Sequence, residues 1–293
     1  MILSENEMNT GGNNTLSNGV CLHGETGLHT GGNDWFSPDV RLSAADIDDI
    51  VISPVRAGSA TADQVKREMS LAPSLLPNLN AQFDALWTTL YQSGISTYGG
   101  ELLPDFIFNS AGYANIVRVN QWWWTVQRGD LQPHTIYLVN HGMQLAGGVD
   151  AQNVAIIAKG QIGVGGGPDL HFDKVYFFGE GALNLAGNIS YGDPQTYCDD
   201  GKFDVYLFSK ERIGLGGWGP SAWIYGMVAA APDFQPGGSM KSAGGIYVEA
   251  RNTIQLGGNT QISGCGTRLE ADMDLSFPPG EPTVIAAGGS LVR

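Results

Sequence analysis

Residues Val20–Asn33 read VCLHGETGLHTGGN, and variants of this stretch recur along the chain. Each copy begins with β-branched or aromatic residues, passes through a polar or glycine turn, continues with a second apolar pair and closes on a glycine-rich turn. Four further copies align with the first without a gap, and one fits with its first strand shifted by one residue. The gapless copies are Val154–Gly167, Val175–Asn188, Val205–Trp218 and Ile246–Asn259, and the shifted copy is Thr135–Gly148.

The spacing of these copies indicates the architecture. Several begin about 20 residues apart, which is typical of one coil of a solenoid. In a parallel β-helix three short strands form a rung, and each rung stacks about 4.8 Å above the last. We therefore expect an all-β fold, a right-handed parallel β-helix, because parallel β-connections are overwhelmingly right-handed. A β-propeller, with blades of about 40 residues that equal two copies, is the structural alternative.

Composition narrows the classes of function. The chain has 293 residues, of which 42 are glycine, and its formal net charge is −14. This charge argues against a nucleic-acid binder and against adsorption to anionic lipid. No run of 18 apolar residues is present, so no membrane span is expected. Residues 1–10 lack the basic and apolar regions of a signal peptide, so we expect any export signal to lie outside this sequence.

The repeats divide the chain into three regions. Residues 1–50 are expected to form the first coils, residues 51–133 an insertion, and residues 134–293 the main β-helix. Within these, residues 1–19 are predicted to be irregular or a fraying coil, and residues 190–203 and 231–245 to be loops. The tail, 278–293, is predicted to form the last rung. We expect the first copy to stack directly on the Thr135 rung, across the insertion.

The insertion has a different pattern. Thr61–Ser93 has helical spacing, divided into two short helices by Pro73 and Pro77. Strand-like runs follow at Leu102–Phe108 and Ile116–Val126, and the second contains three consecutive tryptophans. The insertion is expected to cap or pack against the β-helix, with alternate tryptophan rings buried there or with an exposed aromatic surface.

The cysteine and histidine residues are candidates for a metal site and for a disulfide. On a strand, Cys21 and His23 would point to the same face, close to His29, as in the start of a zinc site. No second pair of ligands follows, so we predict no metal site and ordinary strand residues here. Cys198 and Cys265 lie at turns and are candidates for a disulfide, which would leave Cys21 single.

Pairs of carboxylates are candidate catalytic groups, because glycosidases need two of them across the scissile bond. The candidates are Asp48-Asp49, Asp169 with Asp173, Asp199-Asp200, and Glu270 with Asp272 and Asp274. Few basic residues accompany them, and acidic turns on an acidic protein are usually solvated. We predict no catalytic residues and no cofactor, and no motif supports Ca²⁺. The Gly-Gly pairs are attributed to turns that require a positive φ.

Three segments resemble a bacterial family: NNTLSNGVCLHGETGLHTGGNDWFSPDVRLSAADIDDI, RGDLQPHTIYLVN and GGIYVEARNTIQLGGNTQISGCG. They are similar to the C-terminal exported region of TadE/TadG-like Flp (tight-adherence) pilus-assembly proteins, over Asn13–Asp49 and about Val117–Gly266. The resemblance implies a structural, adhesive or assembly-related component of the cell surface or periplasm. Its implied partners are pilus or cell-envelope proteins.

These observations lead to three functional hypotheses. The first is a non-enzymatic shaft or adhesin domain, extracellular or periplasmic, whose end rungs could pair with another copy. The second is a polysaccharide-active β-helix enzyme, a lyase or a hydrolase. The third is a carbohydrate-binding module that binds surface glycans. Its stacking residues would be Trp122, Trp123, Trp124, Trp218, Trp223 and Tyr225.

Overall fold

A computed structural model of the whole chain gives the fold. The residues that the structure describes are 1–69, 79–92, 113–165, 170–195, 203–217, 219, 222–265, 273–275, 283–286 and 290–292. Leu102–Phe108, Cys198 and Trp218 lie outside them, as do several of the carboxylates named above.

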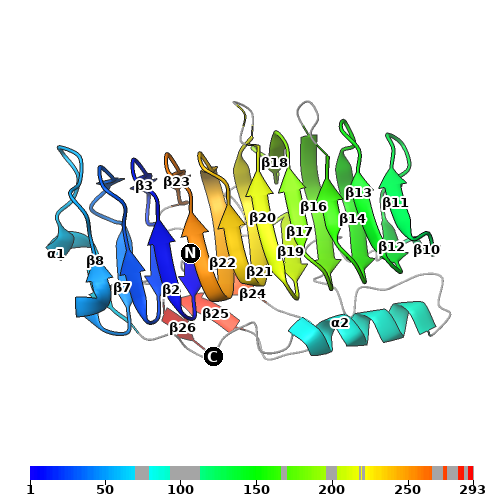
Figure 1. The fold of residues 1–293 in the computed structure, drawn as a ribbon, viewed down its shortest axis with the longest axis horizontal. Coiled ribbons are helices and arrows are strands. Elements are labelled where there is room, and N and C mark those ends of the chain that lie inside the picture. The colour runs from blue at the N-terminus through cyan, green and yellow to red at the C-terminus, as the bar shows by residue number, and fades with distance from the viewer. Residues whose placement is uncertain are drawn as a thin grey trace.

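The predicted parallel β-helix is confirmed: the molecule is a parallel β-solenoid of about ten turns (Figure 1). Twenty-three strands join one continuous sheet. The first nine are β1 (Ile2–Ser4), β2 (Glu7–Thr10), β3 (Thr15–Ser17), β4 (Cys21–Gly24), β5 (Gly27–His29), β6 (Trp35–Phe36), β7 (Arg41–Ala44), β8 (Ile50–Val51) and β9 (Lys66–Glu68). The next seven are β10 (Asn115–Val119), β11 (Trp123–Val126), β12 (Thr135–Val139), β13 (Gly142–Leu145), β14 (Ala151–Ala158), β15 (Ile162–Val164) and β16 (Leu170–Gly179). The last seven are β17 (Leu183–Ala186), β18 (Ile189–Tyr191), β19 (Val205–Ser209), β20 (Arg212–Gly216), β21 (Ile224–Pro236), β22 (Lys241–Leu256) and β23 (Gln261–Ser263).

The solenoid has three faces. The first face contains β1, β4, β7, β9, β10, β12 and β19, and we call it the helix-side face. The second, which we call the open face, contains β2, β5, β8, β11, β13, β15, β17 and β20. The third face contains β3, β6, β18 and β23, and the long strands β14, β16, β21 and β22 run across corners from one face to the next.

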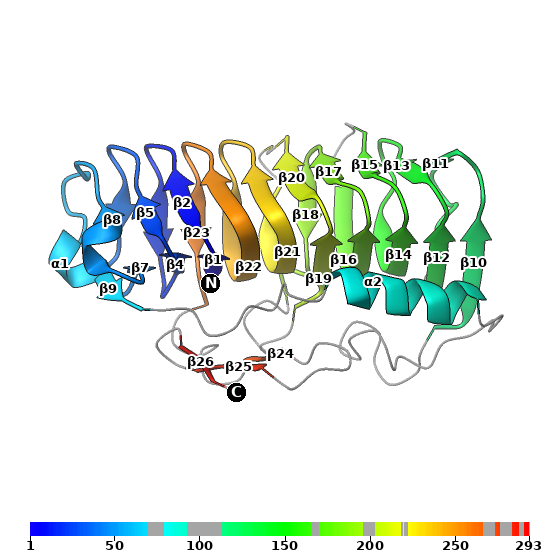
Figure 2. The same ribbon diagram turned by 60° about the horizontal axis from the view of Figure 1, so that its bottom comes forward.

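The chain does not traverse the solenoid from end to end. β1 lies in the middle of the shaft, paired with β22 on one side and with β4 on the other. From there residues 2–68 wind towards one end, where β9 pairs with β7. The next strand in the sequence, β10, lies at the far end of the shaft, where it pairs with β12, and from there the rungs wind back until β23 meets β3 (Figures 1 and 2).

This path overturns the predicted contact between the first copy and the Thr135 rung. Residues 21–36 stack between residues 2–17 and residues 41–55, whereas β12 stacks between β10 and β14. The joint that closes the solenoid is instead made by β22 and β23 against β1, β2 and β3. Strand pairing between segments far apart in sequence leaves no mark in the repeat pattern, so the order of the rungs could not be predicted from it.

The apolar runs of the helix-side face are buried on both sides. In VYFF of β16, Val175 and Phe177 point into the solenoid core, while Tyr176 and Phe178 point outward into a second apolar cluster. Strands covered on both faces read as continuous apolar runs and not as alternating ones.

A helix supplies part of the outer cover. α2 (Leu79–Trp87) is followed by a π-helical turn (Thr88–Gln92) and lies along the helix-side face (Figure 2). The ring of its Phe83 meets that of Phe178 edge-on, with centroids 5.2 Å apart. The Lys159 and Lys210 ammonium groups lie over the rings of Trp87 and Phe83, at 4.7 Å and 5.1 Å.

Several other predictions are corrected by the strand pairing. Residues 2–17 are a full rung, and strands of three or four residues were too short for alternation to be visible. β21 and β22 extend through most of residues 231–245, so that stretch is no loop. Residues 115–126, predicted as part of the insertion, form the terminal rung. In the tail, β24 (Met273–Leu275), β25 (Thr283–Ala286) and β26 (Ser290–Val292) form a separate antiparallel sheet and no rung.

The predicted positive φ is found at the second glycine of two Gly-Gly pairs, Gly148 at 83° and Gly217 at 72°, but the Gly-Gly-Asn turns need glycine for a different reason. In the Gly-Gly-Asn turns the positive φ belongs to the third residue, as at Asn13, Asn33 and Asn259, where φ is 65°, 66° and 63°. The first glycine instead lies against the backbone of the neighbouring rung: a Cβ at Gly31 would meet Gly11 and Gly12 at under 3.0 Å. Close stacking of rungs, and not backbone conformation, therefore requires these glycines.

Candidate functional site

The exposed large apolar side chains of the described residues lie at the two ends of the solenoid. Ile47, Val51 and Val55 lie at the end formed by β8, and Val117, Trp122 and Trp123 at the end formed by β10 and β11. Trp122 is 80% exposed and Trp123 is 43% exposed, which is unusual for residues of this size. The terminal rung of β10 and β11 is therefore the first place to look for a binding site.

The three consecutive tryptophans have three different environments. Trp124 points inward, packs against the solenoid core and lies 5.3 Å from the ring of Tyr137. Trp123 points outward on the open face, and Trp122 lies in the turn before β11. Only Trp124 is needed to close the apolar core at this end, so the exposure of the other two is not explained by folding.

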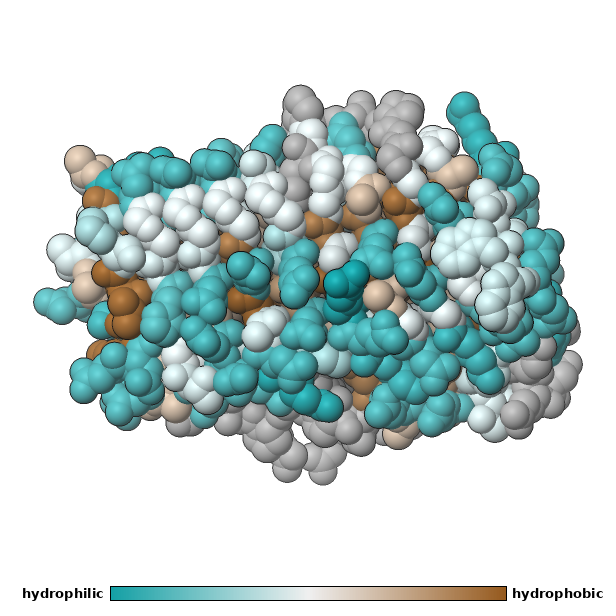
Figure 3. All heavy atoms as spheres, viewed as in Figure 1, coloured by the Kyte–Doolittle hydropathy of each residue, from teal (hydrophilic) through white to brown (hydrophobic). Residues whose placement is uncertain are grey.

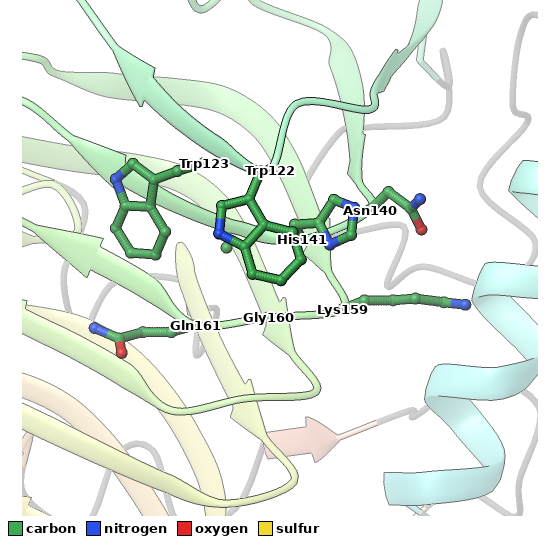
Figure 4. A pocket seen from close by; sticks show the side chains of 8 residues that line it. Trp122, Trp123, Asn140, His141, Lys159, Gly160 and Gln161 are labelled. Atoms are coloured by element: carbon green, nitrogen blue, oxygen red, sulfur yellow. The ribbon is translucent and has the colours of Figure 1, made fainter.

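Trp122 and Trp123 form one wall of a surface hollow of about 320 Å³ (Figure 4). The remaining walls come from the turns that precede β13 and β15 in the next two rungs. The lining residues are Trp122, Trp123, Asn140, His141, Gly142, Lys159, Gly160 and Gln161.

Glycines make the floor of this hollow flat. The Trp123 ring lies directly against Gly142, where a Cβ would come within 2.5 Å of a ring atom. A Cβ at Gly160 would meet the backbone of His141 and Gly142 at under 3.0 Å. The ring of His141 lies 4.8 Å from that of Trp122, tilted by 41°. The aromatic rings of the hollow therefore lie next to the glycine backbone of Gly142 and Gly160.

Amide groups supply the polar part of the hollow. Asn140 and Gln161 line it from two successive rungs, and Gln161 extends on the Trp123 side (Figure 4). Lys159 directs its ammonium group away, towards α2 and the Trp87 ring. The lining contains no aspartate or glutamate. The hollow can therefore stack a flat ligand and hydrogen-bond its hydroxyls, but it offers no carboxylate pair for acid–base chemistry.

Sequence reasoning identified the tryptophans of this site and missed their neighbours. Asn140, His141 and Gln161 lie in turns of copies that looked like ordinary repeats. The signal that could have found them is their common position, just before the second strand of adjacent copies.

The other predicted stacking residues lie elsewhere. Trp223 and Tyr225 are half-buried and stack with centroids 6.5 Å apart, and the Lys241 ammonium lies 5.5 Å from the Trp223 ring. They precede and begin β21, next to the third-face pairs Tyr191–Ile224 and Ile224–Ser242. They are therefore separate from the Trp122–Trp123 hollow.

The histidines considered for a metal site do not converge. His23 is fully buried, with Nδ1 2.9 Å from the Ser43 hydroxyl and Nε2 2.9 Å from a Glu25 carboxylate oxygen. Burial lowers the pKa of His23, and the neighbouring Glu25 partly offsets this. His29 is exposed on the open face, 3.7 Å from Glu7. Among the described residues no group of three or more histidine, cysteine, aspartate or glutamate side chains could hold a metal ion. The Ser43–His23–Glu25 chain is closed to substrates because Ser43 is also buried.

One group of carboxylates lies close together. Burial, followed by repulsion from Asp173, raises the pKa of Asp204, and a second neighbour, Asp193, donates a backbone hydrogen bond to it. Asp173 was among the predicted candidates, whereas Asp193 and Asp204 were not. One carboxylate oxygen of Asp173 is buried without a hydrogen-bond partner. This group is where an acid–base mechanism is to be tested.

Of the cysteines predicted to pair, Cys265 is disulfide-bonded, and Cys198 lies outside the described residues. Cys21 keeps its thiol and is buried on β4. With three cysteines in the chain, we expect one titratable thiol in the denatured, unreduced protein and three after reduction. Titration of three thiols before reduction would contradict the disulfide.

Two further findings bear on the hypotheses made from the sequence. No helix among the described residues is long and apolar enough to cross a membrane. No protein-family model, curated protein or solved structure matches this chain. The resemblance to TadE/TadG-like proteins therefore stays a prediction.

Proposed function

We propose that this protein is a non-enzymatic, glycan-binding adhesive solenoid of the cell envelope or cell surface. The observation that carries the proposal is the Trp122–Trp123 pair, exposed beside the amides of Asn140 and Gln161 in one hollow. Sugar rings have apolar faces and hydroxyl edges, which match aromatic faces flanked by amide donors and acceptors.

The exposure of Trp122 and Trp123 to water, which is unfavourable for the folded protein, supports a binding role. Water-exposed tryptophans are disfavoured in a stable soluble domain and are enriched where a partner covers them. Here the apolar core is already closed by Trp124. A disulfide at Cys265 is consistent with an oxidising compartment outside the cytoplasm, where glycans are met.

Binding to a panel of oligosaccharides by calorimetry tests the proposal. Each indole that covers one sugar face removes on the order of 100 Å² of apolar surface from water, or about 2 kcal/mol. We therefore expect Trp122→Ala and Trp123→Ala each to weaken binding by about tenfold or more, without a change in melting temperature. Trp223→Ala, a matched change on the third face, should retain wild-type affinity.

The same panel separates binding from cleavage. Products are followed by chromatography for wild-type protein and for Asp204→Asn. We expect no turnover in either. Cleavage that Asp204→Asn abolishes would replace the adhesive role with a hydrolytic or lyase role at the Asp173–Asp204 group, and the absence of any sugar binding would contradict the proposal.

A further inference from the structure

A column of outward-facing residues runs along the open face from the Trp122–Trp123 hollow. Strand register places one member in each rung, because Thr125 pairs with Gln144, Gln144 with Gly163, Gly163 with Asn184, and so on. Phe234 pairs with Ile254, so Gln235 and Gln255 follow at the same level. The column comprises Thr125, Gln144, Gly163, Asn184, Gly214, Gln235, Gln255 and Asn9. We call it the amide column.

The amides of this column are available to a ligand. Within the described part of the chain, the side chains of Gln144, Asn184, Gln235 and Gln255 make no hydrogen bond to other protein groups. Amides elsewhere do bond between or within rungs: the Asn33 side chain donates to that of Asn13, and Asn14 donates to the Gly11 carbonyl. The solenoid therefore uses its turn amides for internal bonds and leaves these four amides of the column unused, whereas Asn9 at the end of the column donates to the Glu7 carboxylate, 3.1 Å away.

The two glycines of the column have no structural cause. Gly163 and Gly214 lie inside strands, where glycine costs about 0.5–1 kcal/mol relative to alanine. Neither has a positive φ, and a Cβ would meet its nearest neighbour at 3.6 Å at Gly163 and at 3.5 Å at Gly214, which are ordinary contact distances. The first glycines of the Gly-Gly-Asn turns, Gly11, Gly31 and Gly257, are different, since backbone atoms of a neighbouring rung block their Cβ positions. Glycine inside a strand often marks a bulge, a bend or the close approach of a ligand or another backbone. Gly214 is half-buried on the open face, so a ligand can approach its backbone, whereas Gly163 is buried beside the Gln161 and Gln144 side chains.

The geometry of the face suits a long ligand. α2 lies against the helix-side face (Figure 2). The side of the molecule that faces the viewer in Figure 1 is mainly hydrophilic (Figure 3). From Thr125 to Gln235 the column spans five rung spacings, or about 24 Å. Gln161, which lines the hollow beside Trp123, also lies next to Gly163, since its amide nitrogen would be 3.6 Å from a Cβ placed there. The hollow and the column are therefore continuous.

We propose that the amide column binds an extended, uncharged polysaccharide that runs parallel to the solenoid axis, with its end stacked in the Trp122–Trp123 hollow. The proposal rests on the function proposed above and names its ligand class. The rung spacing is close to the length of one pyranose unit, so hydroxyls of successive sugars meet successive amides. A sugar ring lies over Gly214, and at the buried Gly163 the ligand meets the neighbouring Gln144 and Gln161 side chains instead. The ligand is uncharged because the column from Thr125 to Gln255 contains no ionisable side chain and because Arg212 and Asp233, which flank it, pair in register with opposite charges.

The test compares short and long ligands. Linear cello-, xylo-, manno- and chito-oligosaccharides of two and six units are titrated calorimetrically into the full chain. For the sugar that binds, we expect the hexamer to bind at least tenfold more tightly than the dimer. Gly214→Val should reduce this advantage and leave dimer affinity unchanged, because valine suits a strand but covers the backbone that the sugar would approach. Gly163→Val should also reduce it, because a larger side chain there displaces the Gln144 and Gln161 side chains.

Controls separate this inference from folding and from the Trp122–Trp123 site. Gln144→Ala and Asn184→Ala are small changes that should weaken hexamer binding severalfold even if a valine variant fails to fold. Equal affinity for dimer and hexamer, or hexamer binding unaffected by all four substitutions, would overturn the amide column. If Trp123→Ala still weakens dimer binding in that case, the proposed function stands without the amide column. If none of the sugars binds, both the amide column and the proposed function are contradicted.

Discussion

Replacing Gly31 by alanine is expected to cost about 1–3 kcal/mol of unfolding free energy. A Cβ at this position would lie under 3.0 Å from backbone atoms of Gly11 and Gly12 in the next rung. Backbone cannot rotate away as a side chain can, so the rungs must separate locally, and overpacking of this kind typically costs about 1–3 kcal/mol or more. Urea unfolding followed by far-ultraviolet circular dichroism measures the loss.

Gly32 provides the matched control, because it is the adjacent residue of the same turn. No atom lies within 4 Å of a Cβ placed there, and its φ is not positive. Gly32→Ala should therefore leave stability unchanged or raise it by a few tenths of a kcal/mol through the entropy of the unfolded chain. Equal destabilisation by the two substitutions would show that the turn needs glycine for its conformation and would contradict the rung-contact explanation.

Replacing Asp34 by asparagine is expected to stabilise the protein at neutral pH by about 1–3 kcal/mol. One carboxylate oxygen of Asp34 accepts a hydrogen bond of 2.7 Å from the Asn14 backbone N–H, and the other is buried without a partner. Burial raises the pKa of Asp34 from 3.8 to about 6, and the Asn14 hydrogen bonds and the Arg56 charge only partly offset it. The folded state therefore disfavours the ionised form.

The sign of the pH dependence follows from that shift. Below about pH 4 the carboxyl is protonated in both states and imposes no penalty. As pH rises from 4 to 6 the unfolded state ionises first, so stability is lost, by up to about 3 kcal/mol for a shift of about two pKa units. Above pH 6 the penalty is constant. Asp34→Asn should abolish this contribution.

The repeat itself supports asparagine at this position. Asn14, one rung earlier, accepts a hydrogen bond of 2.9 Å from the Thr260 backbone N–H through its side-chain oxygen and donates to the Gly11 carbonyl. An asparagine at 34 can make the equivalent bonds with Asn14 and with the Gly31 carbonyl.

Urea unfolding of wild type and variant between pH 4 and 7 measures the difference. Asp49→Asn, at an exposed position, is the control and should show no such pH-dependent gain. A gain for Asp34→Asn that does not change between pH 4 and 7 would contradict the raised pKa.

Sequence reasoning located the tryptophans of the candidate site but not the site itself. The sequence does not show which of Trp122, Trp123 and Trp124 are exposed. Their exposures depend on which side of β11 faces the core. The amide column was invisible for a related reason. From Thr125 to Gln255 its members are separated by 19 to 30 residues, and the unequal turn lengths hide their common register until the strands are paired.

The repeat by itself determined that the chain forms a parallel β-solenoid. Apolar residues at a spacing of about 20, punctuated by glycine turns, bury their side chains when one coil stacks on the next, and this single-copy spacing favoured the solenoid over a β-propeller. Tertiary structure alone decided the order of the coils, because β1 pairs with β22 through backbone hydrogen bonds that any strand of suitable length could make. It also decided which faces are covered. The side chains of Phe83 and Trp87 bury the outer aromatic residues of one face, and the amide-rich face is left open for a ligand.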